Sequence, residues 1–283
     1  MICLDGFVPD HERLWAAVSM RGILVADLQV SLLEEGVHSG IAGGVVASSF
    51  RVLCELLDRV EDAASGAVLL PEFNVTVPGE HREILASQAE VAASPAEHVR
   101  LLPGVTPVYP GRLAQLIAQC WEPSVGYVGI DGAPPVHEAG SVLRPSTTVR
   151  LSVRLPPTAD QKAAARALSS ALISTPPYGA RAEFRLVATE RGWLSVLAAE
   201  HRELLETASQ RGYGEGAGLC GGAATIPFLG MFASRHPDAA ILPVGVLGPG
   251  SNPHSPDECL DLLAARKLSV AVASLLADLV GPA

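Results

Sequence analysis

Two segments of the chain alternate between hydrophobic and polar residues, which is the pattern of a strand with one buried face. In GILVADLQVSLLEE, which begins at Gly22, apolar side chains occupy every second position. TTVRLSVRLPP, which begins at Thr147, alternates in the same way until a pair of prolines ends it. Two further segments, SVGYVGIDG from Ser124 and ARAEFRLVATE from Ala180, are also expected to be strands.

Helical patterns separate these strands. Apolar residues recur at helical spacing over 46–60. TADQKAAARALSSALIS, which begins at Thr158, opens with a Thr or Asp cap and is rich in helix formers. Between these two helices lies a proline-rich insert, residues 67–124, in which short helices are expected near 80–92 and 111–119.

With the insert set aside, residues 21–190 follow the order βαββαβ. This order predicts a ferredoxin-like sandwich, an antiparallel four-stranded sheet with two helices on one face. The tail differs: a long helix from Trp193, a glycine-rich loop leading into a short helix, an apolar strand from Ala239 and a closing amphipathic helix. An apolar strand between helices is typical of an α/β layer.

We therefore expect two domains. Residues 1–20 and 191–283 would form an incomplete α/β domain, with the first 20 residues as one of its strands, and residues 21–190 would form the sandwich. The 283 residues carry a net charge of -10, which argues against nucleic acid or an anionic membrane as the main partner. A hydrophobic content of 48% predicts a sizeable core and some apolar surface that a partner covers.

The cysteines indicate a reducing compartment. Five are scattered along the chain, and none forms a C-x-x-C pair, which excludes a zinc finger and a disulfide framework. The sequence contains neither a signal peptide nor an apolar run long enough for a membrane helix. A cytoplasmic location is therefore expected.

Two residues follow apolar runs, where open α/β sheets collect their sites. His254 lies in GPGSNPHSPDE after the strand from Ala239, and Asp5 lies in ICLDG. As a pair at two strand ends they are typical of metal ligands that a sheet brings together. The alternatives are a surface-loop histidine and a solvated turn aspartate.

Two other residues are candidates for binding. His38 lies in GVHSG, where glycines permit a sharp turn and the close approach of another molecule, although an incidental hairpin histidine has the same pattern. Arg154 ends a strand and is suited to a bidentate grip on a carboxylate, and Arg144 and Arg150 are weaker candidates. A metal or catalytic role is not expected for two tempting motifs, HPD at residues 236–238 and the Glu34-Glu35 pair.

Six motifs together resemble the carnosinase-like dipeptidases, within the zinc metallopeptidase family that includes aminoacylase and glutamate carboxypeptidase. They cover nearly the whole chain, in the family's order: CLDG, EEGVHSGIAGGVVASSFRVLCELLDRVED, SVLRPSTTVRLSVRLPP, PPYGARAEF, GGAATIPFLGM and GVLGPGSNPHSPDE. The resemblance implies a zinc-binding α/β domain interrupted by a ferredoxin-like lid that also dimerises. It further implies two zinc ions and a small peptide substrate.

The resemblance also assigns roles to individual residues. It makes Asp5 and His254 metal ligands, and His38 the lid histidine that stabilises the oxyanion in the active site of the other subunit. Arg154 would hold the carboxylate of the substrate, and the hydroxyls of Thr225 and Ser141 would lie near it.

The sequence also departs from the family pattern. The family's H-x-D motif, bridging Asp and Glu-Glu pair lie upstream of its CLDSG-like motif, whereas this chain begins at MICLDG. Gly222 and Gly250 replace an acid and a frequent histidine. Two remaining ligands do not make a stable zinc site, so we expect no peptide hydrolysis by this chain alone. One interpretation is the C-terminal part of a zinc dipeptidase, truncated or completed by a separate N-terminal half; the other is a non-catalytic dimerisation or interaction module.

Overall fold

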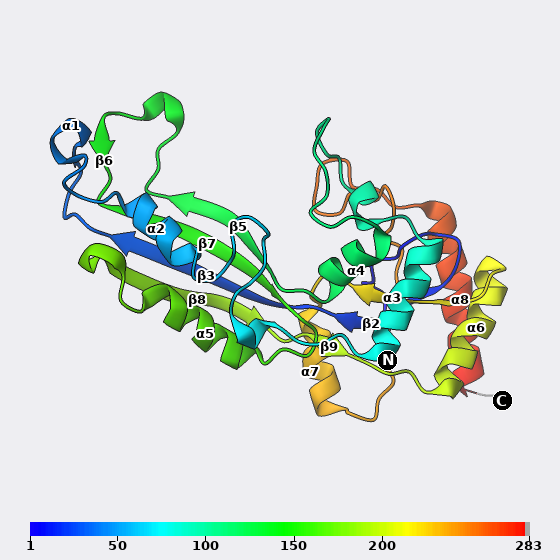
Figure 1. Ribbon diagram of the computed structural model, residues 1–283. Helices are drawn as coiled ribbons and strands as arrows, with labels where there is room; N and C mark the ends of the chain where they lie inside the picture. The colour runs from blue at the N-terminus through cyan, green and yellow to red at the C-terminus, as the bar shows by residue number, and fades with distance from the viewer. Residues whose placement is uncertain (281–283) are drawn as a thin grey trace. The chain divides into compact units, whose positions relative to one another are not determined.

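The computed structural model describes residues 1–280, which form two compact units (Figure 1). Unit 1 comprises Met1–Arg21, Thr76–Trp121 and the chain from Gly192 onward. Unit 2 comprises Gly22–Val75 and Glu122–Arg191. The sequence had placed residues 76–121 with the sandwich, whereas the structure packs them with the other unit.

Unit 2 is built on a four-stranded sheet in the order β5-β7-β3-β8, in which every neighbouring pair is antiparallel. Its strands are β3 (Gly22–Ser31), β5 (Ser124–Asp131), β7 (Ser146–Leu155) and β8 (Arg181–Glu190). All four predicted strands are thus confirmed. The alternation along β3 corresponds to a strictly alternating burial, because its apolar residues point into the core and its polar residues do not.

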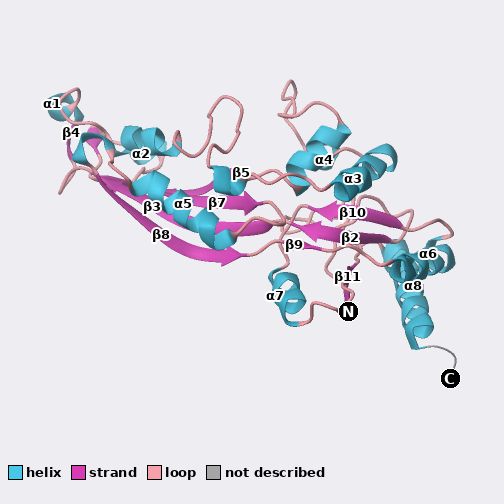
Figure 2. Ribbon diagram, turned by 60° about the horizontal axis from the view of Figure 1, so that its bottom comes forward, coloured by secondary structure: helices cyan, strands magenta, loops and turns pink. Residues whose placement is uncertain are grey.

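Two helices cover one face of this sheet, α2 (Ser49–Leu57) and α5 (Gln161–Ile173) (Figure 2). The Asp160 side chain accepts hydrogen bonds from two backbone amides in the first turn of α5, and so acts as its N-cap. The apolar faces of both helices join the inner face of the sheet in one core. The largest side chains buried there are Phe73, Leu24, Leu28, Leu53, Leu56, Leu151, Leu155, Leu168 and Leu172.

At one end of this sheet the chain forms a small two-stranded ribbon. It consists of β4 (Val37–His38) and β6 (Val142–Leu143), which pair antiparallel, with the short helix α1 (Ser39–Ala42) between β4 and α2.

Short 3₁₀ turns occur in both units. Unit 2 contains η1 (Pro71–Phe73), η3 (Val136–Glu138) and η4 (Pro177–Gly179), and unit 1 contains η2 (Pro95–His98).

The centre of unit 1 is β2 (Trp15–Met20), in which every residue is buried. It pairs in parallel with β10 (Gly218–Gly222) and antiparallel with β9 (Trp193–Leu194). A second small sheet pairs β1 (Ile2–Cys3) in parallel with β11 (Leu242–Pro243). An α/β layer is present as predicted, but it is split into two small sheets.

Five helices belong to unit 1: α3 (Gly79–Val91), α4 (Arg112–Cys120), α6 (Ala199–Tyr213), α7 (Pro227–Arg235) and α8 (Leu262–Val280). Helices α6 and α8 lie side by side (Figure 1). Helix α3 packs on β10, where Gln88 accepts a 3.2 Å hydrogen bond from the Gly221 amide. This packing explains why residues 76–121 join unit 1.

The structure differs from the sequence prediction at three further places in unit 1. The glycine-rich segment predicted as a loop contains strand β10. The long helix starts at Ala199, because Trp193–Leu194 pairs with β2 instead. The apolar strand from Ala239 is paired only over Leu242–Pro243 and at an isolated bridge of Leu247. Within residues 1–280, none of the helices combines the length and apolar character needed to cross a lipid bilayer.

Candidate functional site

Two of the predicted site residues, His38 and Ser141, lie together on the β4–β6 ribbon of unit 2. His38 is opposite Val142 in the register, and the Ser39 amide donates a 2.9 Å hydrogen bond to the Ser141 carbonyl. The His38 ring is exposed, and its Nδ1 accepts a hydrogen bond from the Gly40 amide at 3.1 Å. This bond leaves Nε2 directed away from its own backbone, so the ring can act on another molecule.

Arg154 lies at the other end of the same sheet. It is opposite Ile23 of β3 and Ser124 of β5, whereas the ribbon with His38 adjoins the Ser31–Ser146 end. Eight residues of extended strand separate the two ends, roughly 25 Å. The guanidinium is half-buried, and burial lowers the pKa of Arg154. A carboxylate ligand would therefore meet a cation that is partly shielded from water, which strengthens the attraction.

Thr225 is fixed in the loop that follows β10 in unit 1. Its hydroxyl donates a 2.7 Å hydrogen bond to the Arg21 carbonyl. The buried Arg21 side chain in turn donates from Nε to the Ala223 carbonyl at 3.0 Å. Arg21 thus holds this loop at both ends, and in the sequence the one sign of this role is a cation directly after an apolar strand.

Gly222, where the family has an acid, has no room for a larger side chain. A Cβ at this position would lie 2.4 Å from the Met20 sulfur and 2.6 Å from the Ser19 carbonyl oxygen. The backbone of β10 therefore approaches β2 too closely for a carboxylate side chain to fit without a shift. Gly250 has a positive φ of 81° and an open surrounding, so its turn favours glycine.

Asp5 and His254 both follow the paired strands β1 and β11, as expected. The Gly6 amide next to Asp5 donates a 3.0 Å hydrogen bond to the Val244 carbonyl. Asp5 and His254 are both exposed. His254 has a left-handed backbone with a φ of 59°, and its amide donates a 3.2 Å hydrogen bond to the Glu258 carboxylate.

The described residues do not fit a two-zinc centre. Among residues 1–280, no group of three or more His, Cys, Asp or Glu side chains is arranged to hold a metal ion. Catalytic zinc usually takes three protein ligands, and Asp5 and His254 would supply at most one to each ion. The HPD histidine, His236, is exposed at the end of α7, and the exposed Glu34 and Glu35 lie in the turn between β3 and β4.

The sequence does not predict the contacts of the His11 side chain in unit 1, which are made with residues more than 230 positions away in the chain. Its short segment PDHER has neither a helical nor a strand pattern, so only its place in the fold reveals these contacts. They join the two ends of the loop that carries His254.

Comparison with known proteins bears on the predicted resemblance. No family model matches the chain. A cysteinylglycine-S-conjugate dipeptidase from Corynebacterium striatum is 23% identical over 263 residues, which cover 91% of this chain and 55% of that protein. The resemblance to the carnosinase-like dipeptidases is confirmed. Human carnosine dipeptidase 1 shares the fold of this chain with a TM-score of 0.75 at 16% identity, over 97% of this chain and 57% of that one.

A second solved structure has the same fold. The M20 family metallo-carboxypeptidase Sso-CP2 from Sulfolobus solfataricus aligns with a TM-score of 0.79 at 17% identity, over 93% of this chain and 60% of that one. The mixed α/β fold with several sheets is thus that of the metallo-dipeptidases and their relatives. The chain spans little more than half the length of the proteins it matches.

Proposed function

We propose that this chain is the lid and part of the catalytic α/β domain of a dipeptidase-like metallohydrolase, which acts on the peptide or amide bond of a small substrate. The observation that carries the proposal is the arrangement of its site residues. His38 and Ser141 lie together at one end of one sheet, and Arg154 lies at the other end. They are too far apart to contact one small substrate, as expected if His38 serves the partner's active site.

We infer that unit 2 is the ferredoxin-like lid. Its strand order β5-β7-β3-β8 places the chain's first and third sheet strands in the centre, with both helices on one face. This is the arrangement of a split βαβ sandwich. The β4–β6 ribbon is then an extension from the lid that carries His38 and Ser141.

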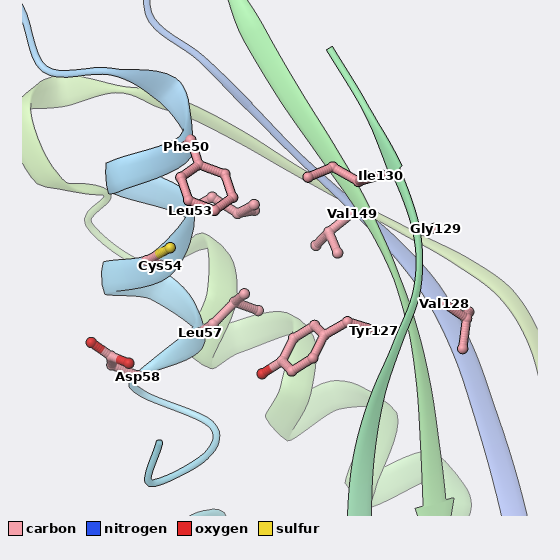
Figure 3. A pocket seen from close by; sticks show the side chains of 10 residues that line it. All are labelled: Phe50, Leu53, Cys54, Leu57, Asp58, Tyr127, Val128, Gly129, Ile130 and Val149. Atoms are coloured by element: carbon pink, nitrogen blue, oxygen red, sulfur yellow. The ribbon is translucent and has the colours of Figure 1, made fainter. Parts of the chain in front are cut away.

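The lid would pair with a second copy of itself through β5 and α2. β5 is an edge strand, so one side of its backbone is unpaired within the described sheet. An open apolar pocket of about 620 Å³ lies between β5 and α2, lined mainly by Phe50, Leu53, Leu57, Tyr127 and Ile130 (Figure 3). Phe50, Tyr127 and Ile130 are each about half exposed, which suits a surface covered by the same surface of a second copy.

In such a dimer, one active site would combine residues of both copies. Arg154 would bind the substrate's carboxylate, and the hydroxyl of Thr225 would lie near the substrate. His38 and Ser141 would come from the partner, where the His38 ring would donate a hydrogen bond to the oxyanion. A donor of this kind stabilises the charge that develops in acyl transfer.

The zinc chemistry needs residues beyond those described. Asp5 and His254 would provide one ligand for each of two ions, so the chain alone would neither hold two zinc ions nor hydrolyse peptides. A separate N-terminal half with an H-x-D motif and a Glu-Glu pair would complete the site. The five free cysteines support a reducing, cytoplasmic location for the protein.

The alternative is a non-catalytic dimerisation module derived from this family. The apolar pocket on unit 2 favours it, because dimerisation needs none of the missing ligands. A reconstitution experiment separates the two functions. The chain is mixed with an N-terminal half that carries both motifs, and hydrolysis of a cysteinylglycine S-conjugate, the substrate named for the Corynebacterium striatum relative, is measured with zinc present.

We expect hydrolysis only in the mixture, and its loss when Arg154 is replaced by Ala. A mixture that contains stable complexes but no hydrolysis would favour the module. Hydrolysis by the chain alone would contradict both functions.

A further inference from the structure

The loop that carries His254 runs from Leu247 to Leu260, and its internal hydrogen bonds are local ones that shape turns within residues 248–259. Its Gly248 amide donates to the Ser251 hydroxyl at 3.1 Å, and its Cys259 amide donates to the Ser251 carbonyl at 3.0 Å. Most of its residues are exposed. These bonds shape the turns of the loop, whereas the place of the whole loop, and of His254 with it, depends on how its two ends are held.

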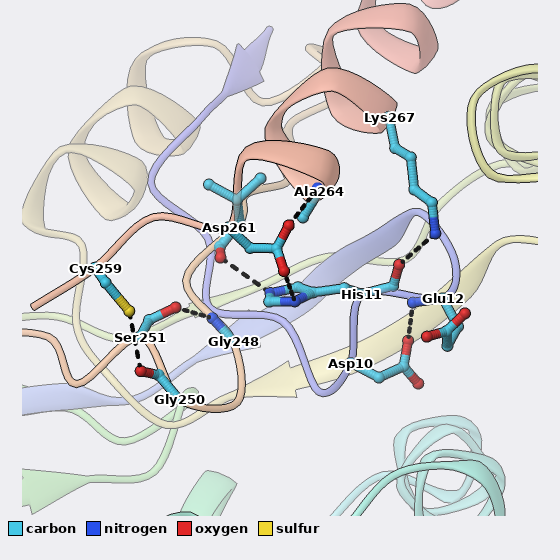
Figure 4. A network of polar contacts seen from close by, with 11 residues as sticks. Asp10, His11, Glu12, Gly248, Gly250, Ser251, Cys259, Asp261, Ala264 and Lys267 are labelled. Atoms are coloured by element: carbon cyan, nitrogen blue, oxygen red, sulfur yellow. Dashed lines mark hydrogen bonds and ion pairs between the residues drawn. The ribbon is translucent and has the colours of Figure 1, made fainter.

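The ring of His11 bridges these two ends (Figure 4). Its Nε2 lies 3.2 Å from the Val246 carbonyl oxygen, just before the loop. Its Nδ1 lies 3.8 Å from a carboxylate oxygen of Asp261, just after the loop. The ring is largely buried, with 19% of its side chain exposed.

The backbone on both sides is shaped for this ring. A Cβ at Gly248 would lie 2.4 Å from Nε2 of His11, so only glycine allows the loop to start this close to the ring. From α8, the Lys267 ammonium donates a 3.1 Å hydrogen bond to the His11 carbonyl. These contacts fix both the ring and its backbone.

The charge state of the ring decides how well it joins the two ends. A carbonyl can only accept, so the bond to Val246 requires a proton on Nε2. In neutral imidazole Nδ1 then presents a lone pair to the Asp261 carboxylate, which is unfavourable. A second proton on Nδ1 converts this contact into an attraction between opposite charges.

Asp261 stays ionised between pH 5.5 and pH 8. One of its oxygens accepts a 2.8 Å hydrogen bond from the Ala264 amide, and the other faces His11. The bonds from the Ala264 and Leu263 amides, together with the charges of His11 and Lys267, lower the pKa of Asp261. The same carboxylate therefore caps α8 and binds the histidine.

We propose that His11 is a positioning residue: its imidazolium form latches Val246 to Asp261 and thereby orders the loop that presents His254. The proposal rests on the proposed function, in which this loop presents His254 as a metal ligand. Two charged groups contact His11 from the C-terminal part of the chain: Asp261, the residue just before α8, and Lys267, which lies in α8. Asp10 and Glu12 flank it on its own segment, where Asp10 accepts hydrogen bonds from the Trp15 ring and the Glu12 amide.

The test is hydrogen exchange of the full chain between pH 5.5 and 8, read by mass spectrometry on a peptide over residues 248–260. A chelator is present throughout, and each rate is corrected for the intrinsic effect of pH. The variants are His11→Gln, which keeps a donor but cannot become charged, and Asp261→Asn, which keeps a helix cap without charge. His201→Gln is the matched control, because His201 lies 4.0 Å from Glu200 on α6 and makes no bond to the loop.

We expect protection of this peptide in the unmodified chain to fall about threefold between pH 5.5 and pH 8, because a neutral imidazole no longer forms the partly exposed ion pair with Asp261. His11→Gln and Asp261→Asn should show low protection at every pH, and His201→Gln should behave like the unmodified chain. Protection that does not change with pH in the unmodified chain would overturn the latch. If His11→Gln fails to fold, Asp261→Asn decides. Because neither metal nor substrate is present, this result is independent of whether the chain contributes to hydrolysis.

Discussion

His38 and Arg154 occupy opposite ends of one antiparallel sheet: His38 lies on the ribbon that continues from the Ser31–Ser146 end, and Arg154 lies opposite Ile23. A single rigid sheet separates them by roughly 25 Å. A small dipeptide cannot reach both residues of one chain. This relationship makes a dimer a requirement of the proposed active site.

His38→Ala should leave the dimer intact. The ring is exposed, and among the described residues its one hydrogen bond is that accepted from the nearby Gly40 amide, so the loss of the ring removes no buried packing. We expect the same mass by light scattering and a free energy of unfolding changed by less than about 0.5 kcal/mol. A monomeric His38→Ala variant would show that the ribbon, and not the β5–α2 surface, forms the interface.

Ile130→Arg should weaken the dimer. Ile130 is half exposed on edge strand β5 and lines the apolar pocket, and a two-fold interface would bring two new charges together. We expect the dimer to dissociate at about tenfold higher concentration or more, measured by sedimentation equilibrium. Val187→Arg is the matched control, because Val187 is a similarly exposed apolar residue on the opposite edge strand, β8. Equal effects of both substitutions would argue against a specific β5 interface.

Asp27 should stabilise the sheet of unit 2 in a pH-dependent manner. Hydrogen bonds from Arg150 and Arg185, on the strands at either side, lower the pKa of Asp27 from 3.8 to about 2. A carboxyl group whose pKa is lower in the folded than in the unfolded state stabilises the folded state at pH values above its unfolded pKa. This stabilisation is lost as the pH falls from about 4 towards 2. Because both arginines are largely exposed, we expect only about 1 kcal/mol of unfolding free energy from this cluster at pH 7.

Urea unfolding of Asp27→Asn at pH 7 and near pH 2 measures this contribution. The loss should be present at pH 7 and absent near pH 2. Glu183→Gln provides the comparison, since Glu183 pairs with Arg181 at an exposed site and should contribute nothing measurable. A loss of equal size at both pH values would mean that the charge of Asp27 is not responsible.

Thr225→Val should destabilise the loop after β10. It removes the hydroxyl that donates 2.7 Å to the Arg21 carbonyl, and one such bond contributes about 1 kcal/mol. Thr225→Ser retains the donor and should lose less. Unfolding free energies and exchange of the peptide over residues 220–228 measure both variants. If Val and Ser variants behave alike, the methyl group of Thr225 matters and the hydroxyl does not.

The sequence predicted unit 2 better than unit 1, for a physical reason. Along β3 the spacing of apolar residues alone determines which face is buried, so local pattern predicted its strand and core. β10 has the sequence GLCGG, which has low strand propensity, and it is a strand only because it pairs with the buried β2 more than 200 residues earlier. The contacts of His11 are likewise made across more than 230 residues, so no local pattern could indicate them.

For the candidate site, too, motifs in the sequence predicted some residues, whereas contacts between distant parts of the chain were not predicted. Motif resemblance predicted roles for His38, Ser141, Arg154 and Thr225, and the sheet register shows which of the first three lie together. Arg21 was missed, because its side chain bonds a backbone carbonyl and leaves no pattern in the sequence.

Zinc binding by the purified chain tests the central claim most directly. Equilibrium dialysis against buffered zinc at neutral pH measures the ions bound per chain, for the unmodified protein and for Asp5→Asn and His254→Asn. We predict that the chain alone does not retain two ions, that neither substitution changes this, and that an added N-terminal half with the H-x-D and Glu-Glu motifs raises the number to two. Two tightly bound ions in the chain alone, lost in His254→Asn, would contradict the account.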